Sequence, residues 1–145
     1  MLSVRRTIRI EWGDCDPAGI VYFPRYFAYL DACTAGLFEA VGLPKRRLLE
    51  IYGILGIPIV DLRARFLAPA RFGDEVVVES RIVKWGRSSF EVQHQILNHG
   101  DLSVEVFETR VWTTKPAGPE EELKSTPIPE EVKHRFQMSS EQPGS

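Results

Sequence analysis

The sequence is poor in cysteine and has no long hydrophobic stretch. Its 145 residues contain two cysteines, Cys15 and Cys33, whereas a disulfide scaffold usually has more of them in a shorter secreted chain. We therefore expect both thiols to be reduced. No run of 18 apolar residues is present, so no membrane-spanning helix is expected. The first residues lack the order of basic, apolar and small residues of a secretory signal, and the expected location is the cytoplasm.

The charges are nearly balanced. The chain carries 18 basic and 20 acidic residues, a net charge of −2. A general nucleic-acid binder usually has a basic surplus, so neither nucleic acid nor a membrane is an expected partner. A local basic patch could still hold a small anionic ligand.

Hydrophobic periodicity predicts one strand followed by one long helix. Residues 4–12 alternate in polarity, which predicts a strand with one buried face. That face would hold Val4, Ile8, Ile10 and Trp12. From Pro24, apolar residues recur every three or four positions, which predicts a helix of roughly 17 residues that ends at Gly42. The helix is rich in aromatic residues and poor in charge, so we expect it to be largely enclosed.

The remainder predicts a short helix over residues 45–52 and then four strands. These strands are expected at residues 57–66, 74–84, 88–97 and 103–113. Their short connections imply antiparallel neighbours. We therefore predict an α+β domain over residues 1–114, with its sheet wrapped around the helix.

Composition changes after Thr114. Residues 115–145 hold five of the ten prolines and many charges, which indicates a C-terminal extension that is partly disordered. A short helix is expected from Ile128, with Pro129 at its first position. The last nine residues, 137–145, are expected to be disordered.

The strongest local signal is the segment 13–24, Gly-Asp-Cys-Asp-Pro-Ala-Gly-Ile-Val-Tyr-Phe-Pro. It places a carboxylate in a tight turn directly before a helix start, where unpaired N–H groups can hold an oxyanion. A nearby carboxylate can act as base or nucleophile, so together they could hydrolyse an activated acyl group. Alternatively, Asp14 and Asp16 only satisfy N–H groups of the turn.

Two other chemistries have weaker signals. Asp14 and Asp16 could bind Mg²⁺, but two carboxylates are a thin ligand set. Cys15 or Cys33 could pair with His94 as a nucleophile, although nothing in the sequence brings them together. We expect a structural role for His94.

The segment 13–21, with Phe-Pro-x-Tyr at 23–26 and Leu-Asp-Ala at 30–32, closely resembles the 4-hydroxybenzoyl-CoA thioesterase family. Residues 56–60 and 84–90 resemble later segments of the same family, so that the similarity covers about residues 5–114. The resemblance implies a hotdog fold, with a five-stranded antiparallel sheet around one long helix. It also implies homo-oligomers that are dimers of dimers, with active sites at subunit interfaces.

The resemblance also implies the site residues. Asp16 would be the catalytic carboxylate, as nucleophile or as base. The N–H of Phe23 would polarise the thioester carbonyl, and Gly19 would give the turn its close approach. Asp31 would face the far end of the acyl group.

The phosphates of CoA need cations, and several arginines lie on the predicted strands. Arg matches phosphate geometry, and Arg87 is the best candidate, with Lys84 beside it. The family's basic stretch is thinner here, since Gly86 and Ser88 stand beside Arg87. Ile57 also takes a place that is a threonine in one member of the family. These departures leave the identity of the acyl group undetermined.

The sequence therefore predicts an acyl-CoA thioesterase for an aromatic acyl group such as 4-hydroxybenzoyl. It needs no metal or redox cofactor, because a thioester is already activated. Pro24 stands where thioesterases for short aliphatic acyl groups usually have a histidine. Those enzymes and a non-catalytic acyl-CoA-binding module remain the alternatives. A hotdog dehydratase would need a different motif with a catalytic histidine.

Overall fold

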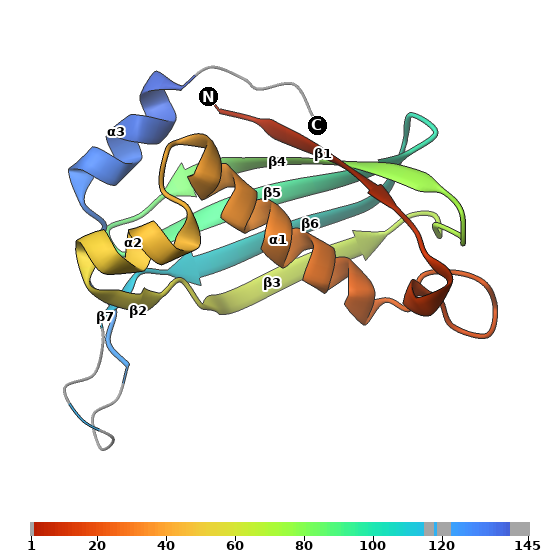
Figure 1. Ribbon diagram of the computed structural model, residues 1–145, viewed down its shortest axis with the longest axis horizontal. Helices are drawn as coiled ribbons and strands as arrows, with labels where there is room; N and C mark the ends of the chain where they lie inside the picture. Colours follow the sequence, from red (N-terminus) through yellow and green to blue (C-terminus); the bar gives the residue numbers. More distant parts are fainter. Residues whose placement is uncertain (1, 115–117, 119–122, 140–145) are drawn as a thin grey trace.

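A five-stranded antiparallel sheet carries helix α1 on one face in the computed structural model of the chain (Figure 1). The structure describes residues 2–114, 118 and 123–139. The strand order is β1-β4-β5-β6-β3, and each neighbouring pair is antiparallel. The strands are β1 (Val4–Arg9), β3 (Ile59–Phe66), β4 (Glu75–Trp85), β5 (Ser89–Asn98) and β6 (Asp101–Val111). The predicted α+β class and the five-stranded antiparallel sheet are confirmed.

Helix α1 (Pro24–Ala40) has the predicted start and length of 17 residues. Proline suits the first helical position because the N–H it lacks would be unpaired there. One side of the helix covers the sheet, with a buried row of Tyr26, Leu30, Cys33, Thr34, Leu37 and Phe38. Arg25, Asp31 and Glu39 are exposed on the other side. The helix is therefore enclosed on one side, less than its apolar composition predicts.

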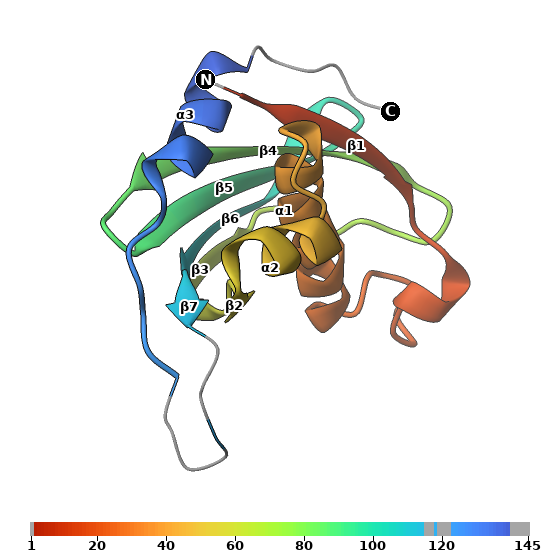
Figure 2. The same ribbon diagram turned by 60° about the vertical axis from the view of Figure 1, so that its left-hand side comes forward.

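Two further helices lie beyond the end of α1 (Figure 2). Helix α2 (Lys45–Tyr52) has the predicted bounds. Helix α3 (Glu130–Met138) begins one residue after Pro129. Gln137 and Met138 belong to α3, so the expected disorder from residue 137 is wrong for these two; residues 140–145 lie outside the described part.

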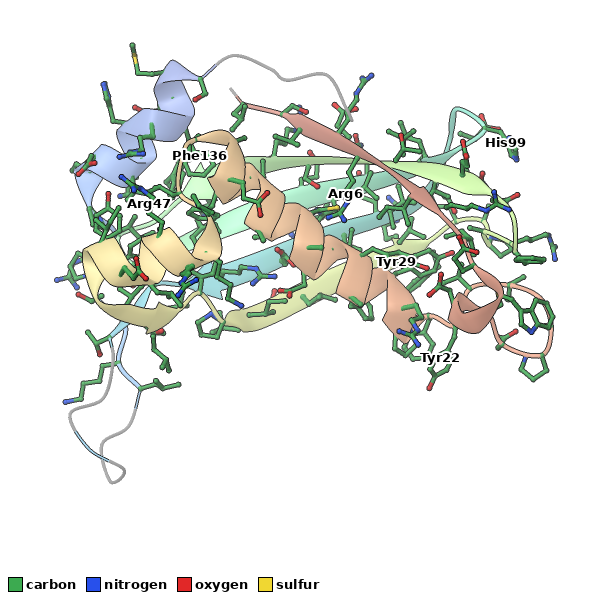
Figure 3. The ribbon with its side chains drawn as sticks, in the orientation of Figure 1. Arg6, Tyr22, Tyr29, Arg47, His99 and Phe136 are labelled. Atoms are coloured by element: carbon green, nitrogen blue, oxygen red, sulfur yellow. The ribbon has the colours of Figure 1, made fainter. Side chains whose placement is uncertain are left out.

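Helix α3 contributes to the hydrophobic core. The Phe136 ring lies 5.1 Å from that of Phe38 and 5.4 Å from that of Trp85, centroid to centroid (Figure 3). Val132 is fully buried in the same cluster. A short ladder, β2 (Ile54–Gly56) with β7 (Thr113–Thr114), closes this end of the molecule. The helix beyond residue 114 thus packs on the sheet domain. Within the described residues, no helix is long and apolar enough to cross a membrane.

The expectation for Trp12 is wrong. Strand β1 ends at Arg9, and a short 3-10 helix over Trp12–Asp14 breaks the alternation. Ile10 remains fully buried, whereas Trp12 is 63% exposed and touches the ring of Phe72 edge-on. The glycine- and aspartate-rich turn therefore begins earlier than the polarity pattern indicates.

Candidate active site

Residues 13–21, the aspartate loop, fold back on themselves directly before α1. The Asp16 N–H donates to the Ile20 carbonyl at 2.9 Å, and the Tyr22 N–H donates to the Asp14 carbonyl at 2.9 Å. Gly19 has φ +79°, a conformation that residues with a Cβ rarely adopt. The open space around its Cα shows that this backbone angle, not crowding, selects glycine.

Asp16 combines a turn role with a spare acceptor. Its Oδ1 accepts a hydrogen bond from the Ala18 N–H at 2.8 Å, which is the bond expected of an aspartate in a turn. Its Oδ2 has no hydrogen-bond partner among the described residues. The half-buried carboxylate is thus fixed through one oxygen, while the other is available to a reactant.

Phe23 offers a backbone donor next to the loop. It caps α1 with helical angles, φ −52° and ψ −35°, and Pro24 follows it. In the part of the chain that the structure describes, no group accepts from the Phe23 N–H. An unpaired N–H at the positive end of a helix is the donor that a developing oxyanion requires. Figure 3 marks this end of α1 by Tyr22 and Tyr29.

Two apolar hollows lie along α1. The first, about 350 Å³, adjoins the aspartate loop and is lined by Ile20, Val21, Phe23, Tyr26, Phe66, Leu67, Ala68 and Pro69. The second, about 430 Å³, begins at Asp31 and runs toward α2; we call it the α1 cavity. Its lining includes Ala35, Phe38, Leu48, Ile57, Pro58 and Arg110. The helix thus carries the catalytic candidates at its start and an apolar chamber farther along.

Asp31 enters the α1 cavity with an arginine at its side. Its Oδ1 accepts from Arg110 Nη2 at 3.0 Å, and the side chains are 65% and 6% exposed, respectively. Arg110 also donates to Glu108 Oε1 through Nε at 2.8 Å. Asp31, a charge on a largely apolar helix, is therefore paired with an arginine from strand β6.

The pair Glu108 and Arg110 was missed from the sequence, although a signal existed. Both residues share the alternation of Val104 and Val106, which places them on the buried face of β6. Charged residues on a buried face must be paired. The alternation could therefore have indicated an internal ion pair, but not its link to Asp31.

His94 completes this buried cluster. It is fully buried, with Nε2 3.3 Å from Glu108 Oε1 and Nδ1 2.6 Å from Ser80 Oγ. Burial alone would raise the pKa of the Glu108 carboxyl, but hydrogen bonds from His94 and Arg110, with the charge of Arg110, lower it to about 2. Glu108 is therefore a buried carboxylate at neutral pH, and His94 has the structural position expected for it.

Lys84 and Arg87 lie far from the aspartate loop. The start of β4 lies near the aspartate loop, because the Ile10 N–H, three residues before the loop, donates to the carbonyl of Asp74, which directly precedes β4. Lys84 lies on β4, ten residues after Asp74. Ten residues of extended strand span about 33 Å. Arg87 follows in the turn to β5, where its carbonyl accepts the Ile128 N–H at 2.8 Å, two residues before α3 begins. Within one chain, both cations and Asp16 thus lie at opposite ends of the sheet.

The other chemistries find less support. Asp14 Oδ2 accepts the Glu11 N–H at 3.0 Å, and no group of three or more potential metal ligands occurs among the described residues. Cys33 is buried, which raises the pKa of its thiol to about 11. Such a thiol is a poor nucleophile at neutral pH. His94 is already bound to Ser80, Thr34 and Glu108.

Comparison with known proteins adds the decisive observation. A family model described as the thioesterase-like superfamily matches residues 10–136. The chain belongs to this superfamily. It is 43% identical over 95 residues to the 4-hydroxybenzoyl-CoA thioesterase of Pseudomonas sp. (strain CBS-3), covering 65% of this chain and 67% of that one. The resemblance to the 4-hydroxybenzoyl-CoA thioesterase family is confirmed.

Two further relatives agree. The crystal structure of a mutant 4-hydroxybenzoyl-CoA thioesterase complexed with 4-hydroxybenzoyl-CoA superposes with a TM-score of 0.85 and 34% identity, covering 94% of this chain and 99% of that one. The 1,4-dihydroxy-2-naphthoyl-CoA hydrolase of Synechococcus elongatus is 28% identical over 100 residues, which cover 69% of this chain and 73% of that one. The hotdog fold and the thioester hydrolase class are thereby confirmed.

Proposed function

We propose that this thioesterase hydrolyses an aromatic acyl-CoA, such as 4-hydroxybenzoyl-CoA, to the free acid and CoA. The observation that carries the proposal is the Asp16 carboxylate, fixed through one oxygen in the loop that precedes α1, together with the Phe23 N–H at the start of that helix, which has no acceptor among the described residues. The names of the relatives support the acyl-CoA class. A cytoplasmic location stays a prediction.

In this proposal, the Phe23 N–H binds the thioester carbonyl oxygen and stabilises the oxyanion that forms during attack. As base, Asp16 takes a proton from water while the water oxygen bonds to the carbonyl carbon. The C–S bond then breaks and CoA leaves as thiolate. As nucleophile, Asp16 bonds to the carbon itself, the C–S bond breaks to release CoA thiolate, and water then hydrolyses the resulting anhydride.

The length of the helix favours an aromatic acyl group. Asp31 lies seven residues after Pro24, about 10 Å along the helix at its usual rise. That distance suits a benzoyl ring with a polar substituent, measured from a thioester at the helix start.

The separation of Arg87 and Lys84 from Asp16 favours a site shared between two chains. Strand β3 is an edge of the sheet, and its Val60 and Phe66 are 61% and 51% exposed. Two copies related by a two-fold axis at this edge would run antiparallel. The Arg87 end of one sheet would then lie beside the Asp16 end of the other, where Arg87 and Lys84 could hold the CoA phosphates. A dimer of dimers is the assembly we propose.

Thiol release from a panel of acyl-CoA esters tests the proposal. The panel contains benzoyl-, 4-hydroxybenzoyl-, 1,4-dihydroxy-2-naphthoyl-, acetyl- and butyryl-CoA. We expect the highest kcat/KM for one of the aromatic esters. Preference for acetyl- or butyryl-CoA would favour the aliphatic alternative, and binding without thiol release would favour a non-catalytic acyl-CoA-binding module.

A further inference from the structure

A cluster of five buried polar side chains lies beneath α1, and the hydrolysis described above uses none of them. Its members are Thr34, Ser80, His94, Glu108 and Arg110. The Thr34 hydroxyl donates to Glu108 Oε1, so Nε2–H of His94 faces Thr34 and Glu108, and Nδ1 lies 2.6 Å from the Ser80 hydroxyl oxygen. Every member is held by another, which makes the cluster rigid.

Arg110 is the member that reaches the α1 cavity, and it joins three elements there. Nε and Nη2 bind Glu108 on β6, at 2.8 and 3.4 Å. Nη2 binds Asp31 on α1 at 3.0 Å. Nη1 binds the Ile57 carbonyl, in the connection from β2 to β3, at 3.1 Å. Asp31, Ile57 and Arg110 all line the cavity.

Two polar groups in the part of the cavity lined by Asp31, Ile57 and Arg110 remain available to a ligand. A guanidinium has five N–H donors, and four bonds from Arg110 to described residues are accounted for. One Nη1–H therefore has no partner among those residues. The second oxygen of Asp31 likewise accepts from none of them. A hydroxyl group both donates and accepts, so it matches this donor and acceptor together.

We infer that Arg110 is a positioning residue that makes the Asp31 end of the substrate site, where the α1 cavity begins, selective for an acyl ring bearing a hydroxyl at its far end. Clamped by Glu108, it fixes the Asp31 carboxylate and the Ile57 carbonyl relative to each other. The inference rests on the proposed function and names its substrate class. Lysine could not replace Arg110, because one ammonium cannot reproduce a planar fork that binds three separate acceptors.

A purely structural ion pair is the competing interpretation. Removing Arg110 leaves Glu108 buried without its partner, which destabilises strongly. Arg110→Lys retains the charge opposite Glu108 and is the primary variant. The double variant Glu108→Leu/Arg110→Met replaces the pair by apolar side chains and serves if the first variant fails to fold, since such replacements are often tolerated. Arg5→Met is the matched control, because Arg5 forms its 3.2 Å ion pair with Glu79 at the opposite edge of the sheet, outside the cavity lining.

The experiment compares kcat/KM for 4-hydroxybenzoyl-CoA and benzoyl-CoA, with the melting temperature of each variant. We expect the wild type and Arg5→Met to prefer the hydroxy ester by about tenfold or more, the scale of a charge-assisted hydrogen bond. In Arg110→Lys and the double variant, that ratio should fall toward one because the loss falls mainly on the hydroxy ester. An unchanged ratio with a lower melting temperature would make Arg110 structural only. A wild type without preference would also overturn the inference, whereas a wild type that cleaves neither ester nor any other of the panel would contradict the proposed function itself.

Discussion

Asp14 and Asp16 are two residues apart, yet their carboxylates have different hydrogen-bond partners. Asp14 Oδ2 accepts the Glu11 N–H at 3.0 Å, and Oδ1 lies 3.9 Å from Arg25 Nε. Asp14 thus ties the aspartate loop to the chain on both sides. Asp16 uses one oxygen for the loop and keeps the other available. The second aspartate is therefore the one suited to chemistry.

The two thiols should differ in reactivity. Cys33 is 5% exposed, and burial raises its pKa to about 11. Cys15 lies partly accessible in the aspartate loop, and its pKa is also raised, due first to burial. About a thousandth of Cys33 would be thiolate at pH 8 even with access. With an aromatic disulfide reagent, we expect one thiol to react in the native protein and two after denaturation. Rapid reaction of native Cys15→Ser would contradict this account of Cys33.

The aspartate loop could be predicted residue by residue, whereas the Arg110 contact could not. The loop is mostly local, since most of its backbone hydrogen bonds join residues 11–22 and two more reach Ala70 and Phe72. Glycine and aspartate also have intrinsic turn preferences. The Asp31–Arg110 contact joins positions 79 residues apart. It depends on how α1 crosses the sheet, which alternation alone does not determine. A sequence pattern shows that Arg110 is buried, but not which carboxylates it meets.

At the scale of elements, Glu108 links β6 to α1 and β5 through hydrogen bonds to Thr34 and His94. Its folded-state pKa of about 2 lies below the ordinary value of 4.5. The carboxylate therefore stabilises the fold fully above about pH 4.5, and this contribution is lost as the pH falls toward 2. The shift corresponds to a stabilisation on the order of 3 kcal/mol at neutral pH.

We therefore predict that Glu108→Gln lowers the free energy of unfolding, and that the difference from wild type depends on pH. Urea unfolding should give a constant difference between pH 5 and 7 and a smaller one at pH 3. Glu91→Gln, which alters an exposed ion pair of the neighbouring strand, is the control and should change stability little. A Glu108→Gln difference equal at pH 7 and pH 3 would rule out this linkage.

Helix α3 should contribute measurably to stability through one aromatic ring. Phe136 is 4% exposed and contacts Phe38 and Trp85. Phe136→Ala should cost about 3–5 kcal/mol, the usual range for a buried phenylalanine. His134→Ala, an exposed change on the same helix, should stay within about 0.5 kcal/mol. Urea unfolding measures both, and a Phe136→Ala loss below about 1 kcal/mol would show that α3 does not belong to the cooperative core.

The long elements were predictable because each carries its own period. Helix α1 and the strands β3 to β6 were expected within a few residues of their bounds, since ten or more residues of alternation or helical spacing average out single exceptions. The pairing of β2 with β7 was not expected, because it joins residue 54 to residue 114 in strands of two or three residues. The prediction that Trp12 is buried was wrong for the opposite reason, because the local turn at Trp12–Asp14 ends the strand before its alternation of polarity does.

At the scale of the whole molecule, the sheet separates the proposed chemistry from the proposed nucleotide contact. Arg87→Ala tests that division. Loss of a phosphate contact should raise KM for the CoA ester several-fold and leave kcat unchanged, because the contact is equally strong in the ground and transition states. The corresponding pantetheine ester, which lacks the nucleotide, should not respond. An equal rise in KM for both esters would show that Arg87 does not contact the nucleotide.

A site shared between two copies also predicts that two inactive or weakened variants can restore each other's activity. If Arg87 of one copy serves Asp16 of another, Arg87→Ala and Asp16→Asn chains should complement each other. A mixture reassembled from the two variants should recover part of the low KM and part of the kcat. Activity no higher than the sum of the separate variants would place both residues in sites formed by single chains.

The most direct test of the central claim is single-turnover hydrolysis of 4-hydroxybenzoyl-CoA, or of the best ester of the panel, by Asp16→Asn. This substitution keeps an oxygen that can accept the Ala18 N–H but removes the charge. We predict that the rate of thiol release falls at least about 10²-fold, the usual cost of losing a general base, with little change in ester binding. Asp14→Asn, the matched change two residues away, should lose far less. An Asp16→Asn protein that releases thiol at nearly the wild-type rate would contradict the account.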